Sequence, residues 1–286
     1  MIIDFHTHIF PPHVREGREG YVRRDVTFAE IYGSPRAKIA TAEELLRSMD
    51  EAGVEVSVAL GFAWRDHQDC VRHNDYLLEA AGKSGGRIVP FCTVNPLAGE
   101  AAAREVERCA GGGARGLGEL RPDSQGWALD GPGGDVVAEL ASRHGLILLF
   151  HVTEPVGHEY PGKQGLRLES FYRFAVGHHQ LKLVGAHLAG GLAFFRDFVD
   201  EMGRLGRDTL IDTAAWDLIY RNRAAVWQYV IQTFDSRRTV FGSDFPLVGQ
   251  ATAIEHIQRH TKSWSQAALT RVFGGNAQRL LGGPVN

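Results

Sequence analysis

The 286-residue sequence predicts an α/β protein, a distorted (β/α)8 TIM barrel that forms a single domain. Three observations predict this fold: eight short apolar runs, helical patterns between them, and long loops after several runs with short connections before them. Runs rich in Val, Ile, Leu and Phe are typical of parallel strands that are covered on both faces. Eight alternations of strand and helix over roughly 250 residues are typical of this barrel.

The eight apolar runs are the expected strands. An open, doubly wound sheet is the alternative fold, because its strands and helices alternate in the same way. The first run is not followed by a GxGxxG turn, so the dinucleotide-binding form of that sheet is disfavoured. The runs are MIIDFHTH (1–8), VEVSVALGF (54–62), RIVPFCTVNP (87–96), ARGLGEL (114–120), LILLFHV (146–152), KLVGAHL (182–188), TLIDTAAW (209–216) and TVFGSDFPL (239–247).

Amphipathic helices are expected between the runs. Thr41 and Glu44 form a capping box at the start of one helix. Another helix ends before Gly145, which can adopt the left-handed conformation of a helix terminus. Two more are expected where apolar residues recur at helical spacing: Phe195, Phe198, Val199 and Met202, and then Trp227, Val230, Ile231 and Phe234.

Long loops are expected at one face of the barrel. Residues 1–286 form one barrel domain in this prediction, with a long loop insertion at about 9–40. Further long loops cover 122–134 and 153–166. In a TIM barrel such strand-to-helix loops lie at the C-terminal face, where active sites are built.

Composition restricts the kind of partner. The formal net charge is −3 and no basic run occurs, which argues against a nucleic-acid binder. No apolar stretch reaches the ~18 residues of a spanning helix, and the first strand begins too early for a signal peptide. The three cysteines, Cys70, Cys92 and Cys109, are widely spaced and are expected to be reduced thiols. We therefore expect a cytoplasmic protein that acts on a small molecule, with no nucleic-acid or membrane partner.

Metal-ligating side chains follow five of the expected strands. Because side chains alternate along a strand, the two histidines of HTH face the same way. Each of these residues alone has an ordinary explanation as a packing or turn residue, but together they predict a metal site at the barrel mouth. A mixed set of nitrogen and oxygen ligands suits Zn²⁺ first, with Mn²⁺, Fe²⁺, Co²⁺ or Ni²⁺ as alternatives, and one or two ions. The residues are His6, His8, Glu119, His151, His187 and Asp244.

This metal site would supply hydrolytic chemistry. A divalent ion lowers the pKa of bound water from 15.7 toward about 7. Asp244 can accept the proton of that water and pass it to a leaving group. His187, if it does not bind the ion, can polarise a carbonyl or stabilise an oxyanion.

Arg121 is the third candidate catalytic residue. It lies two residues after Glu119 and therefore shares its face, nearer the rim. Its planar guanidinium is suited to a substrate carboxylate or phosphate. A structural ion pair with Glu119 is the alternative, at equal weight. Large aromatic residues at the same face could line the substrate pocket: Phe10, Trp64, Trp127, Trp216 and Phe245.

The motifs together resemble the amidohydrolase superfamily, and in particular the amidohydrolase-2 branch, over the whole chain. The resemblance rests on the two histidines after the first strand, the later His and Asp positions, and the stretches IIDFHTHIFPP, LLRSMDEAGVEVSVAL, FCTVNP, GSDFP and NAQRLL. That branch includes aminocarboxymuconate-semialdehyde decarboxylase, γ-resorcylate decarboxylase and several lactone hydrolases. At family level it also implies a homodimer.

The resemblance implies a ligand set of His6, His8, His151 and Asp244. It would make His187 a catalyst beside the metal in mononuclear members, or a ligand of a second metal in binuclear ones. Glu119 would then bind one ion or bridge two. The decarboxylases of the branch usually lack a carboxylate ligand after the fourth strand, so Glu119 favours hydrolysis.

We therefore expect a metal-dependent hydrolase of a lactone, cyclic amide or ester, whose substrate could carry a carboxylate. The alternative is a metal-dependent non-oxidative decarboxylase of an aromatic or dienoic acid that uses the same pocket. A metal-binding barrel without enzymatic activity is a third possibility.

Overall fold

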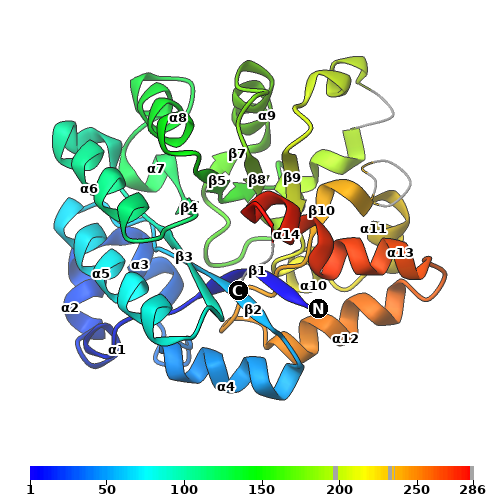
Figure 1. Ribbon diagram of the computed structural model, residues 1–286, viewed down its shortest axis with the longest axis horizontal. Coiled ribbons are helices and arrows are strands. Elements are labelled where there is room, and N and C mark those ends of the chain that lie inside the picture. The colour runs from blue at the N-terminus through cyan, green and yellow to red at the C-terminus, as the bar shows by residue number, and fades with distance from the viewer. Residues whose placement is uncertain (196–198, 231–233, 235, 284–286) are drawn as a thin grey trace.

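The computed structural model is a ring of eight parallel strands surrounded by helices, as the sequence predicts (Figure 1). It describes residues 1–195, 199–230, 234 and 236–283. The strands follow one another around the ring in chain order. They are β1 (Ile3–His8), β2 (Val56–Leu60), β3 (Ile88–Cys92), β4 (Gly116–Leu120), β5 (Ile147–Phe150), β8 (Leu183–Gly185), β9 (Thr209–Asp212) and β10 (Thr239–Val240).

The ring closes between β10 and β1. The backbone N–H of Phe5 donates to the carbonyl of Phe241 at 2.7 Å, and that of His8 donates to the carbonyl of Phe245 at 2.7 Å. A parallel bridge between Thr7 and Phe245 adds to this contact. The open-sheet alternative is therefore wrong, because an open sheet would leave β1 and β10 as unpaired edges.

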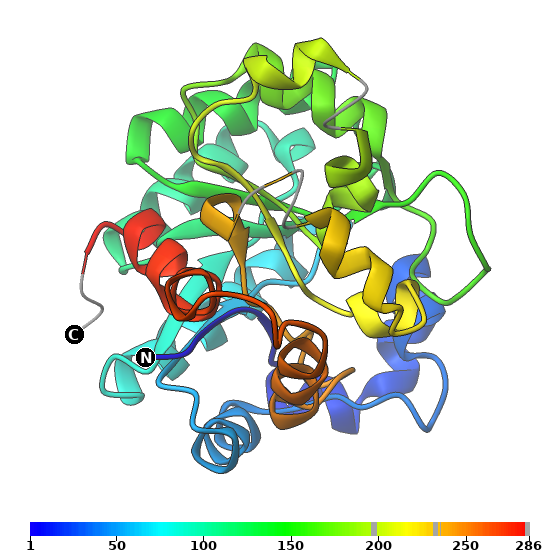
Figure 2. The same ribbon diagram turned by 90° about the vertical axis from the view of Figure 1, so that its right-hand side faces the viewer.

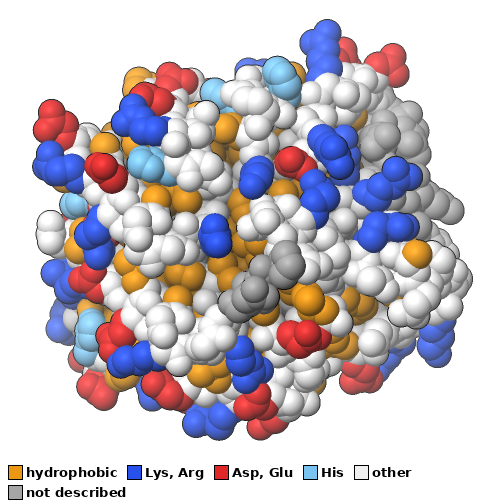
Figure 3. All heavy atoms as spheres, viewed as in Figure 1, with side chains coloured by type: hydrophobic (Ala, Val, Ile, Leu, Met, Phe, Trp, Pro, Cys, Tyr) orange, Lys and Arg blue, Asp and Glu red, His pale blue; other side chains and the backbone are white. Residues whose placement is uncertain are grey.

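The barrel interior is filled by one apolar cluster. It contains Phe5 of β1, Leu149 of β5 and Val240 of β10 among other strand residues. The helix α14 (Asn276–Leu281) contributes Ala277 and Leu280 to the same cluster and lies across the ring in Figure 1. The face seen in that view carries acidic and basic side chains with hydrophobic ones between them (Figure 3).

Helices cover the outside of the ring, and their ends follow the sequence signals. The capping box at Thr41 and Glu44 is present at the start of α4, and Gly145 ends α8 with a φ of 66°. Between the strands lie α4 (Ala42–Ala52), α5 (His67–Lys83), α6 (Glu100–Gly111), α7 (Pro122–Gln125), α8 (Pro132–His144), α9 (Leu168–Gly177), α10 (Trp216–Ile219) and α11 (Ala224–Tyr229). After the last strand come α12 (Gln250–His260) and α13 (Gln266–Thr270).

The two helices predicted from apolar spacing near the end of the chain are only partly formed. Val199 is extended, with φ −133° and ψ 103°, and only a short turn of helix (Asp200–Arg204) follows it. The predicted helix from Phe195 to Met202 is therefore not continuous, and Phe198 lies outside the described residues. Trp227 lies in α11 as expected, whereas Ile231 also falls outside the described part of the chain.

The expected loop insertion at 9–40 is largely helical. It contains α1 (Pro12–Glu16), α2 (Arg18–Arg24) and α3 (Val26–Tyr32). Phe28 of α3 stacks on Trp64 with ring centroids 5.2 Å apart, and both belong to an aromatic cluster beside the barrel. Figure 2 shows this segment and the loop after β5 on the same side of the barrel. That loop carries a small second sheet of β6 (Val152–Thr153) and β7 (Leu166–Arg167).

Two composition-based expectations can be compared with the structure. The side chains of Cys70, Cys92 and Cys109 are buried free thiols. Among the described helices, none is both long and apolar enough to cross a membrane.

Candidate active site

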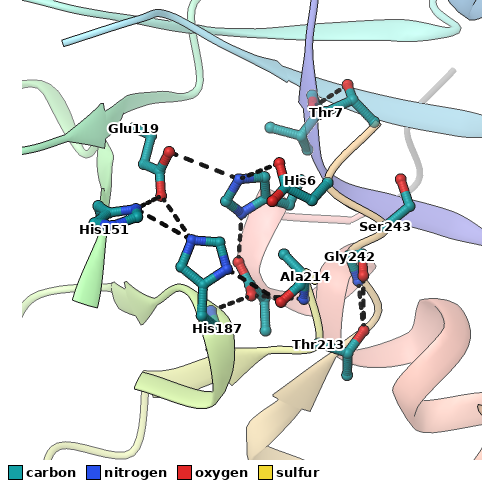
Figure 4. A network of polar contacts seen from close by, with 12 residues as sticks. His6, Thr7, Glu119, His151, His187, Thr213, Ala214, Gly242 and Ser243 are labelled. Carbon is teal, nitrogen blue, oxygen red and sulfur yellow. Dashed lines mark hydrogen bonds and ion pairs between the residues drawn. The ribbon is translucent and has the colours of Figure 1, made fainter. Parts of the chain in front are cut away.

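All six predicted metal-type side chains meet at one end of the barrel. Figure 4 shows four of them, His6, Glu119, His151 and His187, pointing toward one another. His6 and His8 end β1, Glu119 lies in β4, and the other three follow β5, β8 and β10. Each of the six has a ligand atom in at least one group whose atoms lie within 4.8 Å of one another. The groups are His6, His187 and Asp244; His6, His8 and Glu119; and Glu119, His151 and His187.

Glu119 connects the two halves of this cluster. Its Oε1 lies 3.0 Å from Nδ1 of His151 and 3.4 Å from Nε2 of His187. Its Oε2 lies 3.5 Å from Nε2 of His8 and 3.8 Å from Nε2 of His6. Asp244 approaches the same two β1 histidines, with its Oδ1 3.6 Å from His8 Nε2 and 3.7 Å from His6 Nε2.

Of the ligand set implied by the family resemblance, His6 and Asp244 share one group and His6 and His8 share another. In the described part of the chain, no such group contains both His6 and His151. His151 instead faces Glu119 and His187, and the Nε2 of His187 lies 3.1 Å from its Nδ1. His6, Glu119 and His187 each belong to two of the three groups, so these three residues connect the cluster.

Irregular strand ends bring several of these side chains inward. The pairing of β1 with β2 shifts between Asp4 and Thr7, and that of β4 with β5 shifts between Leu117 and Leu120. His187 lies just beyond β8 in a left-handed conformation, with a φ of 59°. Strict alternation would have put His6 and the interior residue Phe5 on opposite faces, so these shifts are needed for convergence.

The hydrogen bonds of the imidazoles indicate a cation site. The Nδ1 of His187 donates to the carbonyl of Ala214 at 3.1 Å, and the Nε2 of His151 donates to the carbonyl of Gly162 at 2.9 Å. Because a carbonyl can only accept, each of these nitrogens carries the ring's proton when the ring is neutral. The two nitrogens that face each other across 3.1 Å are then both lone pairs, and Glu119 adds a carboxylate beside them. Such a set of acceptors fits a bound cation.

Asp212 is a site residue that the sequence reasoning missed. It is fully buried, and its Oδ2 accepts from Nδ1 of His6 at 2.8 Å. Its Oδ1 accepts from the backbone N–H groups of His187 at 2.8 Å and Ala214 at 3.0 Å. This leaves a lone pair on the Nε2 of His6 that faces the cluster. A carboxylate at the C-terminal end of the seventh strand, in TLIDTAAW, was the available signal.

Burial and opposite charges compete to set the pKa values in the cluster. Burial lowers the pKa of His6, but the carboxylates of Asp212, Glu119 and Asp244 outweigh it and raise that pKa to about 10. Burial raises the pKa of Glu119, and the nearby His151 and His6 bring it well below its usual value. Burial dominates at His151 and lowers its pKa, whereas Glu119 raises that of His187. Positive charge in this cluster is therefore favoured, whether it comes from protons or from a metal.

A cavity of about 510 Å³ opens onto the cluster. Its volume lies in the range of pockets that enclose small organic ligands. The five aromatic residues expected at this face do not line it; Tyr32 and Phe62 do. Trp64 and Phe10 are buried in the aromatic cluster instead, because the helical insertion packs over them. Residues of the insertion, the loop after β5 and the chain after β9 and β10 form the wall, including Thr27, Ile31, Arg36, Lys38, His158, Tyr160, Leu218, Ile219 and Leu247.

Arg121 lines the same cavity and is only 4% exposed. Its Nη2 lies 3.7 Å from Oε2 of Glu30, a residue of the insertion. Its Nε and Nη1 are buried and have no hydrogen-bond partner. The structural pair with Glu119 that the sequence left open is not formed, since Glu119 contacts histidines.

A family model described as amidohydrolase matches residues 3–283. The chain belongs to the amidohydrolase family. This confirms the resemblance drawn from the sequence motifs. The search of curated proteins found no match to this chain.

Solved structures with the same fold include several decarboxylases. The 5-carboxyvanillate decarboxylase of Sphingomonas paucimobilis is 20% identical, with a TM-score of 0.76 and 98% of each chain covered. The 2,6-dihydroxybenzoate decarboxylase of Rhizobium is 18% identical, with a TM-score of 0.73 and 98% of each chain covered. A manganese-bound 5-carboxyvanillate decarboxylase of Novosphingobium aromaticivorans is 16% identical, with a TM-score of 0.76, covering 98% of this amidohydrolase and 96% of that chain.

These structures contradict the expectation of a lactone, cyclic amide or ester hydrolase. These enzymes are decarboxylases, which break a carbon–carbon bond, and they agree with the alternative expectation of a decarboxylase. The hydrolase prediction rested on Glu119, which does lie among the histidines. A carboxylate at this position can bind a cation in a hydrolase and in a decarboxylase alike. The presence of Glu119 therefore does not distinguish hydrolysis from decarboxylation.

Proposed function

We propose that this amidohydrolase-family protein is a metal-dependent, non-oxidative decarboxylase of an aromatic acid. The observation that carries the proposal is the cluster of inward-facing lone pairs and carboxylates at the end of a largely apolar cavity. The decarboxylases that share its fold add support for the reaction class.

The cluster fits a divalent cation. His6 would hold it, either with His187 and Asp244 or with His8 and Glu119. Glu119, His151 and His187 would be the ligands of a second ion. Such an ion, when bound, acts as a Lewis acid that orients an acid group and stabilises negative charge. Mixed imidazole and carboxylate ligands suit zinc, our first expectation, and also manganese, which occurs in several of the decarboxylase structures.

The reaction requires one proton at carbon. The bond between the ring carbon and the carboxylate breaks, carbon dioxide leaves, and a proton takes its place on that carbon. Asp244 and His187 line the cavity and can each hold a proton. We assign delivery of the proton to Asp244, since its carboxyl group is not tied to a backbone carbonyl as His187 is.

The cavity wall favours this chemistry. The rings of Tyr32 and Phe62 and the side chains of Ile31 and Leu218 can pack on an aromatic ring. An apolar surround excludes water, and the reaction turns a charged carboxylate into neutral carbon dioxide. The substrate is therefore a small molecule with a flat apolar body.

The test is release of carbon dioxide from a panel of carboxyl-labelled hydroxybenzoic acids. The protein is stripped with a chelator and reloaded with zinc or with manganese. We expect release only after loading, from at least one acid. Loaded protein that releases no carbon dioxide from any acid of the panel would contradict the proposal.

A variant separates metal binding from proton delivery. Asp244→Asn keeps an oxygen that can face the cation but cannot deliver a proton. It should therefore retain metal and lose at least 100-fold in turnover, the lower end of the usual range for a general acid, about 10²–10⁴-fold. Full turnover in Asp244→Asn would remove Asp244 from this role.

A further inference from the structure

The buried guanidinium of Arg121 is a second feature of the cavity that the decarboxylation step does not use. We propose that the substrate carries a second anionic group and that Arg121 binds it. This inference rests on the proposed function of the same cavity, and it narrows the substrate to aromatic acids with two acidic groups.

The first support is the unmet hydrogen-bonding capacity of Arg121. The side chain is 4% exposed, and its Nε and Nη1 are buried without a partner. A guanidinium presents five N–H donors in a planar fork, and leaving buried donors unpaired is costly. An acidic group that accepted from this fork would remove that cost.

The second support is the looseness of the existing ion pair. Glu30 Oε2 lies 3.7 Å from Arg121 Nη2, beyond hydrogen-bond distance. The other oxygen, Oε1, accepts from the backbone N–H of Gly162 at 2.8 Å. One oxygen of Glu30 is therefore hydrogen-bonded to the loop after β5, and its carboxylate only partly neutralises the charge of Arg121.

The third support is the position of Arg121 relative to the cluster. A Cβ built on Gly165 would lie 2.7 Å from Cδ2 and 3.3 Å from Nε2 of His151, and 3.4 Å from Nε of Arg121. Gly165 thus adjoins the edge of His151 that faces away from Glu119, and Arg121 lies on that side. Arg121 therefore borders His151 on the side opposite to the Nδ1 that faces the cluster, and we infer that a second acidic group reaches it while the first is held in the cluster.

The rest of the wall agrees with an anionic ligand. Arg36 and Lys38 of the insertion also line the cavity. At about 510 Å³ the cavity has room for a ring with substituents at both ends.

The experiment measures binding of benzoate and of the three benzenedicarboxylates, phthalate, isophthalate and terephthalate, to the metal-loaded protein by calorimetry. We expect at least one diacid to bind tenfold or more tightly than benzoate. Arg121→Met should reduce that diacid to the affinity of benzoate and leave benzoate itself within twofold. Arg121→Lys, which keeps the charge but not the fork, should recover part of the difference.

Glu30→Gln is the matched control. Its amide oxygen can still accept from Gly162, while the charge that competes for Arg121 is gone, so the preferred diacid should bind as tightly as to wild type or more tightly. Equal affinity of wild type for benzoate and all three diacids would overturn the inference. So would an equal loss for benzoate and diacid in Arg121→Met, which would mean that Arg121 grips the same carboxylate as the cluster.

Failure of the inference can be told apart from failure of the proposed function. Diacid binding that depends on Arg121, without carbon dioxide release from any acid, would refute decarboxylation and leave the second acidic group standing. Release from monoacids as fast as from diacids, with Arg121→Met unchanged on both, would refute the second group and leave decarboxylation standing.

Discussion

Replacing Asp212 by Asn tests whether the hydrogen bonds behind the cluster set the metal site. The carboxylate of Asp212 accepts from Nδ1 of His6 on one oxygen and from two backbone N–H groups on the other. An asparagine has one accepting oxygen. It should stay with the two backbone donors, because an amide NH₂ facing them would leave all three groups without an acceptor.

The amide NH₂ of the variant would then face His6. That histidine would have to accept at Nδ1 and carry its proton on Nε2, the atom that lies 3.1 Å from His8 Nε2. A protonated Nε2 has no lone pair for a metal. Loss of such an orienting partner typically lowers metal affinity 10- to 100-fold, or about 1.4–2.7 kcal/mol.

The assay is competition for zinc between the protein and a fluorescent chelator. Asp217→Asn is the matched control, because Asp217 also holds a histidine, with Oδ2 2.8 Å from Nδ1 of His256, but outside the cluster. We expect the affinity to fall in Asp212→Asn and to stay within twofold of wild type in Asp217→Asn. An unchanged affinity in Asp212→Asn, with the fold intact by circular dichroism, would refute the orientation argument.

Three further outcomes follow from the same contacts. Burial lowers the pKa of His73 from 6.5 to about 4. Between these pH values the unfolded state binds more protons than the folded state, so the free energy of unfolding falls as the pH drops from about 6.5 to 4, by up to about 3 kcal/mol. Denaturant titrations at pH 7 and pH 4 should show this loss in wild type and not in His73→Gln. A Cβ on Gly165 would lie 2.7 Å from Cδ2 of His151, so Gly165→Ala should lose about 10- to 100-fold in turnover, whereas Gly177→Ala, with nothing within 4 Å of its Cβ, should not. Chelation should lower the midpoint of thermal unfolding, since an ion at 100 times its Kd stabilises by about 2.7 kcal/mol.

The barrel itself could be predicted from the sequence, because it depends on patterns that are local. Each strand is an apolar run, and α8 ends, as predicted, at Gly145, a single residue in the left-handed conformation. The insertion was harder, since α1, α2 and α3 have five to seven residues each. Helices this short gain little from intrinsic propensity and form because Phe28 and its neighbours pack on the barrel.

The composition of the cluster could also be predicted, but its internal geometry could not. Position at a strand end identified the six residues, whereas the partner of each depends on register shifts in β1 and β4 and on the left-handed conformation of His187. Asp212 was missed because its partner His6 is 206 residues away along the chain. The expectation of hydrolysis was wrong for a different reason. Glu119 indicates that a cation can bind, but it does not indicate which bond of the substrate is broken.

The two ends of the cavity are joined by one chain of contacts. His151, whose Nδ1 faces the cluster, donates from Nε2 to the carbonyl of Gly162; the N–H of Gly162 donates to Glu30; and Glu30 faces Arg121. A substrate group that draws Arg121 away from Glu30 therefore acts on Gly162, the residue whose carbonyl fixes the orientation of His151. If an aromatic diacid is the substrate, its outer acidic group is coupled to the metal end through Gly162, and the loop after β5 is positioned by the ligand as well as by the barrel.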